Sequence, residues 1–259
     1  MQPQGHPKSL FRRSQRSPLL AQHQGLLIAI AIIGLWCGHL AFILEARVFE
    51  LHPLLLVGLI WVQTFLNTGL FITAHDAIHG LVYPGNRRIN AGIGVLCSAA
   101  YASLSYKTLR RKHWLHHRYP MTASDPDFCG TCQASFLTCY LHFMGQYWGW
   151  KPFVSLAMGV GFAAVIFRLS PWNLALFWAI PLLLSSLQLF YFGTYRPHQQ
   201  AEAGHGPSRC ARSQALPWLW SFLLCYHFGY HQEHHDHPGV PWWQLPTLYQ
   251  GDRIHNGYD

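Results

Sequence analysis

Charged residues are scarce in this chain. Asp, Glu, Lys and Arg together make up 11% of its 259 residues, whereas a typical soluble domain has about 25%. This deficit argues against a soluble globular protein and favours one that lies largely in a bilayer. Of the charged residues, 18 are basic and 10 are acidic. Because the basic residues flank apolar segments and form no separate domain, we expect no nucleic-acid partner.

Several metal and redox motifs are also missing. The 7 cysteines include one Cys-x-x-Cys pair, Cys129 and Cys132, whereas a structural zinc or rubredoxin-like iron site needs a second pair. We therefore expect reduced thiols in a cytoplasmic loop. The pair of Glu-x-x-His motifs that marks soluble di-iron bundles is absent. No flavin, haem or nicotinamide motif is present, so a redox enzyme with this sequence needs a separate electron donor.

The hydrophobic residues, 51% of the chain, gather in long runs. Four transmembrane helices are predicted, at Gly25–Leu44, Pro53–Ala74, Pro152–Phe167 and Pro171–Gly193. The first two are long enough to cross roughly 30 Å of hydrocarbon, while the third is short unless Tyr147, Trp148 and Trp150 lie at the headgroup level. We expect an all-α integral membrane protein, with one domain over residues 1–259 and a polar basic leader at residues 1–24.

The positions of the basic residues predict an orientation. With four spans, the loops at one end are Glu45–His52 and Arg168–Ser170, which hold only Arg47 and Arg168. The other sixteen of the 18 Lys and Arg residues lie at the opposite end, which the positive-inside rule assigns to the cytoplasm. Both termini are therefore predicted to be cytoplasmic.

Eight histidines in three short motifs fall at that same end. They are His75 and His79 in "TAHDAIHG", His113, His116 and His117 in "KHWLHH", and His231, His234 and His235 in "YHQEHH". On a helix, His113 shares a face with both His116 and His117, but these two point about 100° apart. Eight imidazoles also exceed what one ion accepts. The pattern therefore predicts a dinuclear metal site.

The residue types leave the identity of the metal open, because imidazole binds zinc, copper, iron and nickel. Acidic residues stand beside the histidines at Asp76, Asp125, Asp127, Glu233 and Asp236. We expect them to accept hydrogen bonds from the outer ring N–H groups and so fix the tautomer of each ligand. The alternative is that they are solvated surface residues.

Three such histidine motifs at the cytoplasmic ends of membrane helices resemble the membrane-bound fatty acid desaturase and hydroxylase superfamily. The longer strings "LFITAHDAIHGLVYP", "DPDF", "LFYFGTYRPH" and "CYHFGYHQEHHDHPGVPWWQLP" resemble the bacterial and cyanobacterial β-carotene ketolases. This resemblance runs from about Trp61 to Pro246 and weakens at "FCGTCQASF" and in the leader. It implies a cytoplasmic helical cap that holds two iron ions, with O2 as co-substrate.

The resemblance also implies a reaction and a ninth ligand. The reaction is oxidation of the C4 methylene of the β-ionone ring of β-carotene to a ketone, by two hydroxylations and a dehydration, giving echinenone and then canthaxanthin. Electrons would come from an external donor, most simply a ferredoxin. For the ninth ligand we expect His198, which follows the fourth span, and we place His227 beside the ligands or in the pocket wall.

Two further sites follow from the predicted topology. The ring of a lipid-soluble substrate should lie one or two helical turns deeper than the metals, beside Thr68, Phe71, Ile72, Phe190 and Tyr191. A basic patch at Arg87, Arg88, Lys107, Arg110, Arg111 and Lys112 would steer an acidic electron donor or contact lipid headgroups. Both interpretations of the patch remain open.

Other functions fit parts of the pattern. A carotenoid hydroxylase or a lipid desaturase of the same superfamily shares the histidine motifs. "HDAIH" resembles a His-Glu-x-x-His zinc motif with Asp in place of Glu, but an intramembrane zinc hydrolase leaves at least five histidines unused. A bis-histidine haem carrier needs histidines deep in facing spans.

Overall fold

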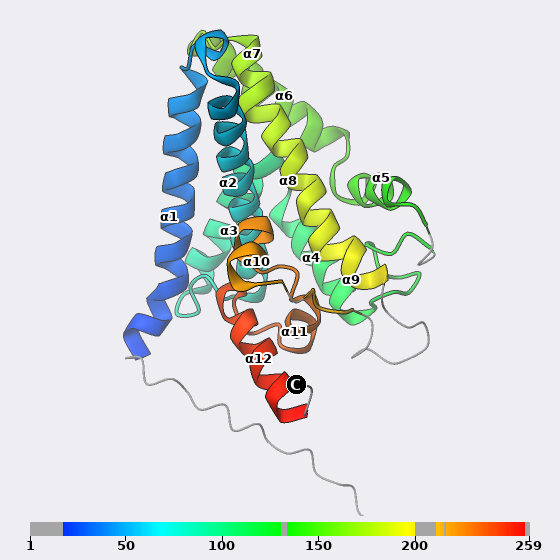
Figure 1. Cartoon of the computed structure of the whole chain (residues 1–259). Coiled ribbons are helices and arrows are strands. Elements are labelled where there is room, and N and C mark those ends of the chain that lie inside the picture. Colours follow the sequence, from blue (N-terminus) through cyan, green and yellow to red (C-terminus); the bar gives the residue numbers. More distant parts are fainter. Residues whose placement is uncertain (1–17, 131–133, 200–210, 215, 257–259) are drawn as a thin grey trace, which may run out of the picture.

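The computed structural model describes residues 18–130, 134–199, 211–214 and 216–256. Most of the basic leader and Cys132 lie outside these residues. The described segments form helices joined by short loops, with no strand among them (Figure 1). The predicted all-α class is confirmed.

Three helical segments are long and apolar enough to cross a membrane. They are α1 (Pro18–Leu44), α2 (Pro53–His79) and a composite segment over Pro171–Gln199. The composite segment is made of α7 (Pro171–Leu174), η2 (Ala175–Ala179), α8 (Ile180–Phe190), η3 (Tyr191–Tyr195) and α9 (Arg196–Gln199). Its η2 and η3 parts are π-helical. Three of the four predicted spans are therefore present as continuous helices.

The predicted third span forms one helix, but that helix is short for a membrane crossing by itself. Its residues form α6 (Trp150–Ile166), which follows α5 (Phe136–Tyr147) at a bend of 79°. The break falls at Trp148 and Gly149, where the backbone is not helical. The bent pair makes a fourth crossing only if both helices are counted as one span.

The two short loops that the sequence placed at one end do lie together. The Asn173 side chain donates to the backbone oxygens of Leu44 and Ala46, both at 2.8 Å. Phe49, in the turn η1 (Val48–Glu50), packs edge-on against Trp172 at 6.0 Å between ring centroids. In Figure 1 this end lies opposite α11 (His231–Asp236) and α12 (Leu245–Asn256).

Polar contacts join the long helices within their apolar surroundings. Trp36 of α1 donates to Asn67 of α2 at 2.6 Å. Thr68 of α2 meets Ser185 and Gln188 of α8 at 2.9 and 2.8 Å. Where a bilayer offers no water, such side chains need partners on neighbouring helices. These bonds attach both α1 and α8 to α2.

Shorter helices complete the end that carries the histidines. They are α3 (Arg87–Ala102), α4 (Tyr106–Arg118), α10 (Trp218–Cys225), α11, η5 (Trp242–Gln244) and α12. Helix α2 ends at Gly80, whose φ of +80° suits glycine, and Ser105 caps α4 by accepting from the Thr108 amide. These turns bring α4 back across the end of α2.

Candidate metal centre and the cavity beside it

Histidines from four helices converge in two groups. The first group contains His75, His79, His113 and His234, and the second contains His116, His198, His231 and His235. Within each group, one ring nitrogen per residue lies within 4.8 Å of all the others. Helix α4 supplies histidines to both groups, because the side chains along this helix point in different directions.

His117 joins the first group. Its Nε2 lies 3.0 Å from Nε2 of His113 and 2.9 Å from Nε2 of His234. Its neighbour on α4, His116, turns the other way, and its Nε2 lies 3.0 Å from Nε2 of His235. The structure therefore brings together all eight motif histidines and His198, the nine positions that the sequence singled out as ligands.

The nitrogen contacts fit bound cations better than hydrogen bonds among the rings. A neutral imidazole has one N–H, yet Nε2 of His113 faces the Nε2 atoms of His79 at 2.8 Å and of His117 at 3.0 Å. In the second group, Nε2 of His231 likewise faces His198 at 3.2 Å and His235 at 3.0 Å. Both ring nitrogens of His75 are buried without a hydrogen-bond partner. A metal ion in each group would satisfy these converging lone pairs.

Burial favours the neutral form that metal binding requires. Desolvation lowers the pKa of His117 to about 3. It also lowers the pKa values of His113, His231, His234 and His235 well below the ordinary range. His116 is the exception: burial lowers its pKa, but Asp127 and Asp125 outweigh this effect and raise it.

The carboxylates around His116 explain that difference. Nδ1 of His116 lies 3.0 and 3.1 Å from the two carboxylate oxygens of Asp125 and 3.7 Å from Oδ2 of Asp127. Asp125 also accepts from the backbone amides of Met121 and Asp127, both at 2.9 Å. This carboxylate is thus held in place to orient the His116 ring and direct Nε2 inward.

Two other acidic residues, Asp76 and Glu233, are held by contacts outside the two histidine groups. Asp76 lies 3.5 Å from Nδ1 of His75, which has no hydrogen-bond partner, and accepts from the Trp242 amide at 3.3 Å, so the hydrogen bond that we expected between Asp76 and a ligand ring is not formed. Glu233 is buried and accepts from the Ser213 hydroxyl. That bond joins α11 to the segment before α10.

His227 lies apart from both groups. Its ring packs 5.1 Å from Trp218 and 6.1 Å from Trp242, between centroids, and it takes no place in either histidine group. This position differs from both that we expected, beside the ligands or in the pocket wall. His227 follows the end of α10 with a positive φ of 61°, which turns its side chain into the aromatic cluster.

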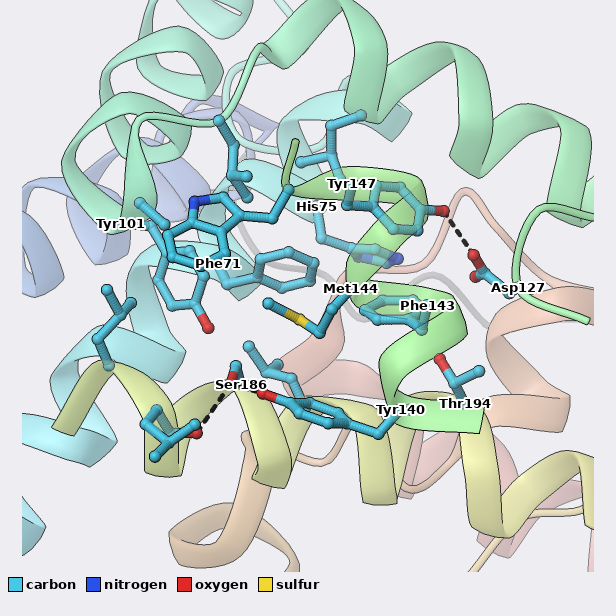
Figure 2. A pocket seen from close by; sticks show the side chains of 18 of the residues that line it. Phe71, His75, Tyr101, Asp127, Tyr140, Phe143, Met144, Tyr147, Ser186 and Thr194 are labelled. Atoms are coloured by element: carbon cyan, nitrogen blue, oxygen red, sulfur yellow. Dashed lines mark hydrogen bonds between the residues drawn. The ribbon is translucent and has the colours of Figure 1, made fainter. Parts of the chain in front are cut away.

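An apolar cavity of about 500 Å³ adjoins both histidine groups. Figure 2 shows Phe71, Phe143 and Met144 around it, with His75 at one side. His113, His116 and His231 also line it. Two tyrosine hydroxyl groups lie in the cavity wall. The hydroxyl of Tyr147 donates to Asp127 at 2.6 Å, and the hydroxyl of Tyr140 shares a hydrogen bond with Ser186 at 2.7 Å.

The cavity opens sideways. Leu141 of α5, Phe153 of α6 and Leu183 of α8 line it and are still 61%, 56% and 53% exposed. The opening therefore lies between helices that are apolar enough for a bilayer, not only at the polar end of the molecule.

Of the five predicted pocket residues, only Phe71 lines this cavity. Thr68, which is bonded to α8, and Ile72, which is fully buried in the core, do not line it. Phe190 and Tyr191 do not line it either. On the same composite segment, Leu189, Gly193 and Thr194 line the cavity, and the last two belong to the π-helical turn η3.

The opposite wall was missed. It comes from α5 and α6, and its residues on α5 are Tyr140, Leu141, Phe143, Met144 and Tyr147. All of these except Leu141 follow an i, i+3, i+4, i+7 pattern, which marks one face of a helix and could have identified the wall. Trp148, expected at the headgroup level, also lines the cavity.

The expectation of reduced thiols was wrong for Cys129, which forms a disulfide with Cys139 of α5. The fold brings the start of α5 back to the loop that follows Asp127.

The sequence profile of the fatty acid desaturase family matches residues 51–154 and 144–254, which include every site histidine. The chain therefore belongs to the fatty acid desaturase family. Its similarity within that family is to the β-carotene ketolases. It is 40% identical to "Beta-carotene ketolase" of Paracoccus sp. strain N81106, over 88% of this chain and 93% of that protein.

Algal relatives are similar as well. The chain is 36% identical to "Beta-carotene 4-ketolase 3" of Haematococcus lacustris, over 88% of this chain and 80% of that protein. It is 34% identical to "Zeaxanthin 4-ketolase" of Chlamydomonas reinhardtii, over 87% of this chain and 53% of that protein.

Proposed function

We propose that this chain is a membrane β-carotene ketolase, which uses O2 to convert the C4 methylene of a β-ionone ring to a ketone. One observation carries the proposal: two histidine groups border an apolar cavity that opens sideways between membrane helices. The names of its relatives give the substrate class. A C40 hydrocarbon dissolves in the bilayer, so a lateral opening suits its approach.

We propose His75, His79, His113, His117 and His234 as ligands of one iron, and His116, His198, His231 and His235 as ligands of the other. When bound, the iron pair supplies O2 activation and removal of a hydrogen from C4. The protein supplies placement and exclusion of water. Phe71, Phe143 and Met144 would hold the ring against the histidines, and Asp125 would fix the His116 ring.

Two successive hydroxylations of C4 give a geminal diol, which loses water to form the ketone. Each hydroxylation consumes one O2, two electrons and two protons and releases one water. The electrons come from a separate carrier, and we propose a ferredoxin. We also propose that the histidine end and both termini face the cytoplasm, as the basic residues indicate.

Pigment analysis in a β-carotene-producing host tests this function. We expect expression of the chain to yield carotenoids with a 4-keto group, identified by mass and by a red-shifted absorption spectrum. His117→Ala serves as the inactive control. Formation of only hydroxylated carotenoids would instead identify a hydroxylase. Unchanged carotenoids with altered fatty acids would indicate a lipid desaturase.

The metal content tests the dinuclear site. The purified chain should hold about two irons, as nine imidazoles in two groups can serve two ions. His116→Ala and His117→Ala should each lower the iron content, because their rings belong to different groups. A stoichiometry of one zinc per chain would contradict the di-iron proposal.

A further inference from the structure

The outer face of α4 carries an exposed tryptophan next to the metal centre. Trp114 is 43% exposed. Its ring centroid nevertheless lies 5.1 Å from that of His79 and 5.7 Å from that of His117. Both histidines belong to the first group, so this one side chain connects the protein surface with two rings of the candidate metal site.

Cations surround Trp114 at helical spacing. Arg111 is three residues before it, Arg110 four before and Arg118 four after, and Lys107 lies one turn further along the same face. All four are exposed. In the part of the chain that the structure describes, none of the four forms an ion pair with a carboxylate. We call Trp114 and these four cations the α4 face.

The α4 face contains only some of the residues of the basic patch that the sequence indicated. Lys112 belongs to the other side of α4, where its ammonium donates to the backbone oxygen and the side-chain oxygen of Gln146 at 2.5 and 2.8 Å. Arg87 and Arg88 begin α3 and are not on this helix. The positive charge of α4 that remains free for a partner therefore lies around Trp114.

We propose that the α4 face is the docking surface for an acidic one-electron carrier protein, and that Trp114 is its electronic connection to the metals. This inference rests on the proposed function, since only a redox centre needs such a connection. A lipid headgroup would account for the cations, but it would not require an aromatic ring in contact with two metal ligands.

The transfer is a simple redox step. In each docking event the carrier loses one electron and the metal pair gains one, and no bond in the chain is made or broken. Trp114 shortens the path between the surface and the ligands and is itself neither oxidised nor reduced. Two events supply the electrons that each hydroxylation consumes.

The test uses the full chain, iron-loaded and in lipid nanodiscs, with reduced plant-type [2Fe–2S] ferredoxin as the probe. Anaerobic stopped-flow absorbance measures ferredoxin oxidation, and surface plasmon resonance measures ferredoxin binding. Dithionite, a small reductant that needs no docking, reduces the metals in a parallel measurement. Iron content is determined for every variant.

For Arg110→Gln combined with Arg118→Gln, we expect ferredoxin association to slow by about tenfold at low salt. The difference should shrink as salt screens the remaining charges. If binding stays unchanged while only the dependence on anionic lipid is lost, the face contacts lipid and the proposal is wrong.

For Trp114→Leu, we expect ferredoxin to bind normally but to reduce the metals severalfold more slowly, with dithionite reduction unchanged. Trp114→Phe should recover part of the rate, and it replaces the Leu variant if that variant loses iron. Trp150→Leu is the matched control, as Trp150 is 71% exposed beside Lys151 and lies outside the site. Equal effects of Trp114→Leu and Trp150→Leu would refute the role of Trp114.

The two proposals fail in different ways. If the wild-type chain makes no ketone in the β-carotene-producing host, the proposed function is wrong. If it does so, and the α4 face variants oxidise ferredoxin at the wild-type rate, only the docking proposal is wrong.

Discussion

His116 differs from the other histidines of α4 because two carboxylates face its outer nitrogen. Asp125 is at hydrogen-bond distance and is itself held by two backbone amides. Asp127 lies further off, at 3.7 Å, and accepts from Tyr147. A carboxylate that accepts the outer N–H fixes the ring orientation and raises the basicity of the ligand.

Substitution of Asp125 should therefore affect the metal more than substitution of Asp127. We expect Asp125→Asn to lower iron affinity or activity by about 10–100-fold, measured by metal analysis and ketone yield. Asp127→Asn is the matched control, with a smaller loss of iron. Equal iron loss in both variants would mean that neither carboxylate acts through the geometry of His116.

Substitution also distinguishes the role of His198 from that of His227. His198 lies 3.2 Å from His231 within the second group, so we expect His198→Ala to lose iron and turnover. His227→Ala should keep its iron but melt earlier, because it removes a buried side chain at a cost of about 0.5–3 kcal/mol. Iron loss in His227→Ala with full occupancy in His198→Ala would reverse the assignment.

At the scale of elements, the π-helical turn η3 brings the helix backbone close to the metal centre. A Cβ atom on Gly193 would lie 2.1 Å from Cε1 of Phe228. The ring of Phe228 in turn packs 4.9 Å from that of His75, between centroids. Only a residue without a side chain allows this close approach of η3 and Phe228.

We accordingly expect Gly193→Ala to destabilise the protein by about 1–3 kcal/mol through overpacking, and to reduce ketone formation by moving Phe228. Thermal unfolding in detergent measures the first effect and pigment analysis the second. Gly159→Ala on α6 is the control, since a Cβ there meets nothing within 4 Å. If Gly193→Ala changed neither the unfolding temperature nor the ketone yield, Phe228 would be able to move without loss of stability.

Helix α6 forms the cavity wall with one face and leaves another exposed. Ala157 lines the cavity, whereas Val165 is 77% exposed. We expect Ala157→Phe to lower ketone yield with the iron content unchanged, because it takes up cavity volume beside the ring. Val165→Phe should leave both quantities unchanged. Full activity of Ala157→Phe would mean that the ring binds away from α6.

At the scale of the whole molecule, the two loops with few cations share one end, and the histidine helices lie at the other (Figure 1). We expect reporters fused to either terminus to be cytoplasmic, active as a fluorescent protein and inactive as a phosphatase. The physical reason is the excess of Lys and Arg at the histidine end. A phosphatase active at one terminus would contradict the predicted number of spans.

The sequence by itself determined the membrane class, three continuous spans and the eight motif histidines. These features are local: an uncharged run of sufficient length crosses a bilayer, and helical spacing alone makes His116 and His117 diverge. The pocket prediction was limited because it, too, used only local helical spacing. Counting turns from His75 found Phe71 but also gave Thr68, because the count does not show where α8 packs directly on α2.

Only the tertiary structure decided which helix faces meet. It placed His198 in a histidine group and His227 outside both groups, set α5 at an angle to α6 just ahead of the third predicted span, and paired Cys129 with Cys139. It also placed Trp114 against His79, thirty-five residues earlier in the chain. Such contacts depend on packing between segments far apart in the sequence, where a π-helical turn or a loop break changes the facing residues without changing the hydrophobic pattern.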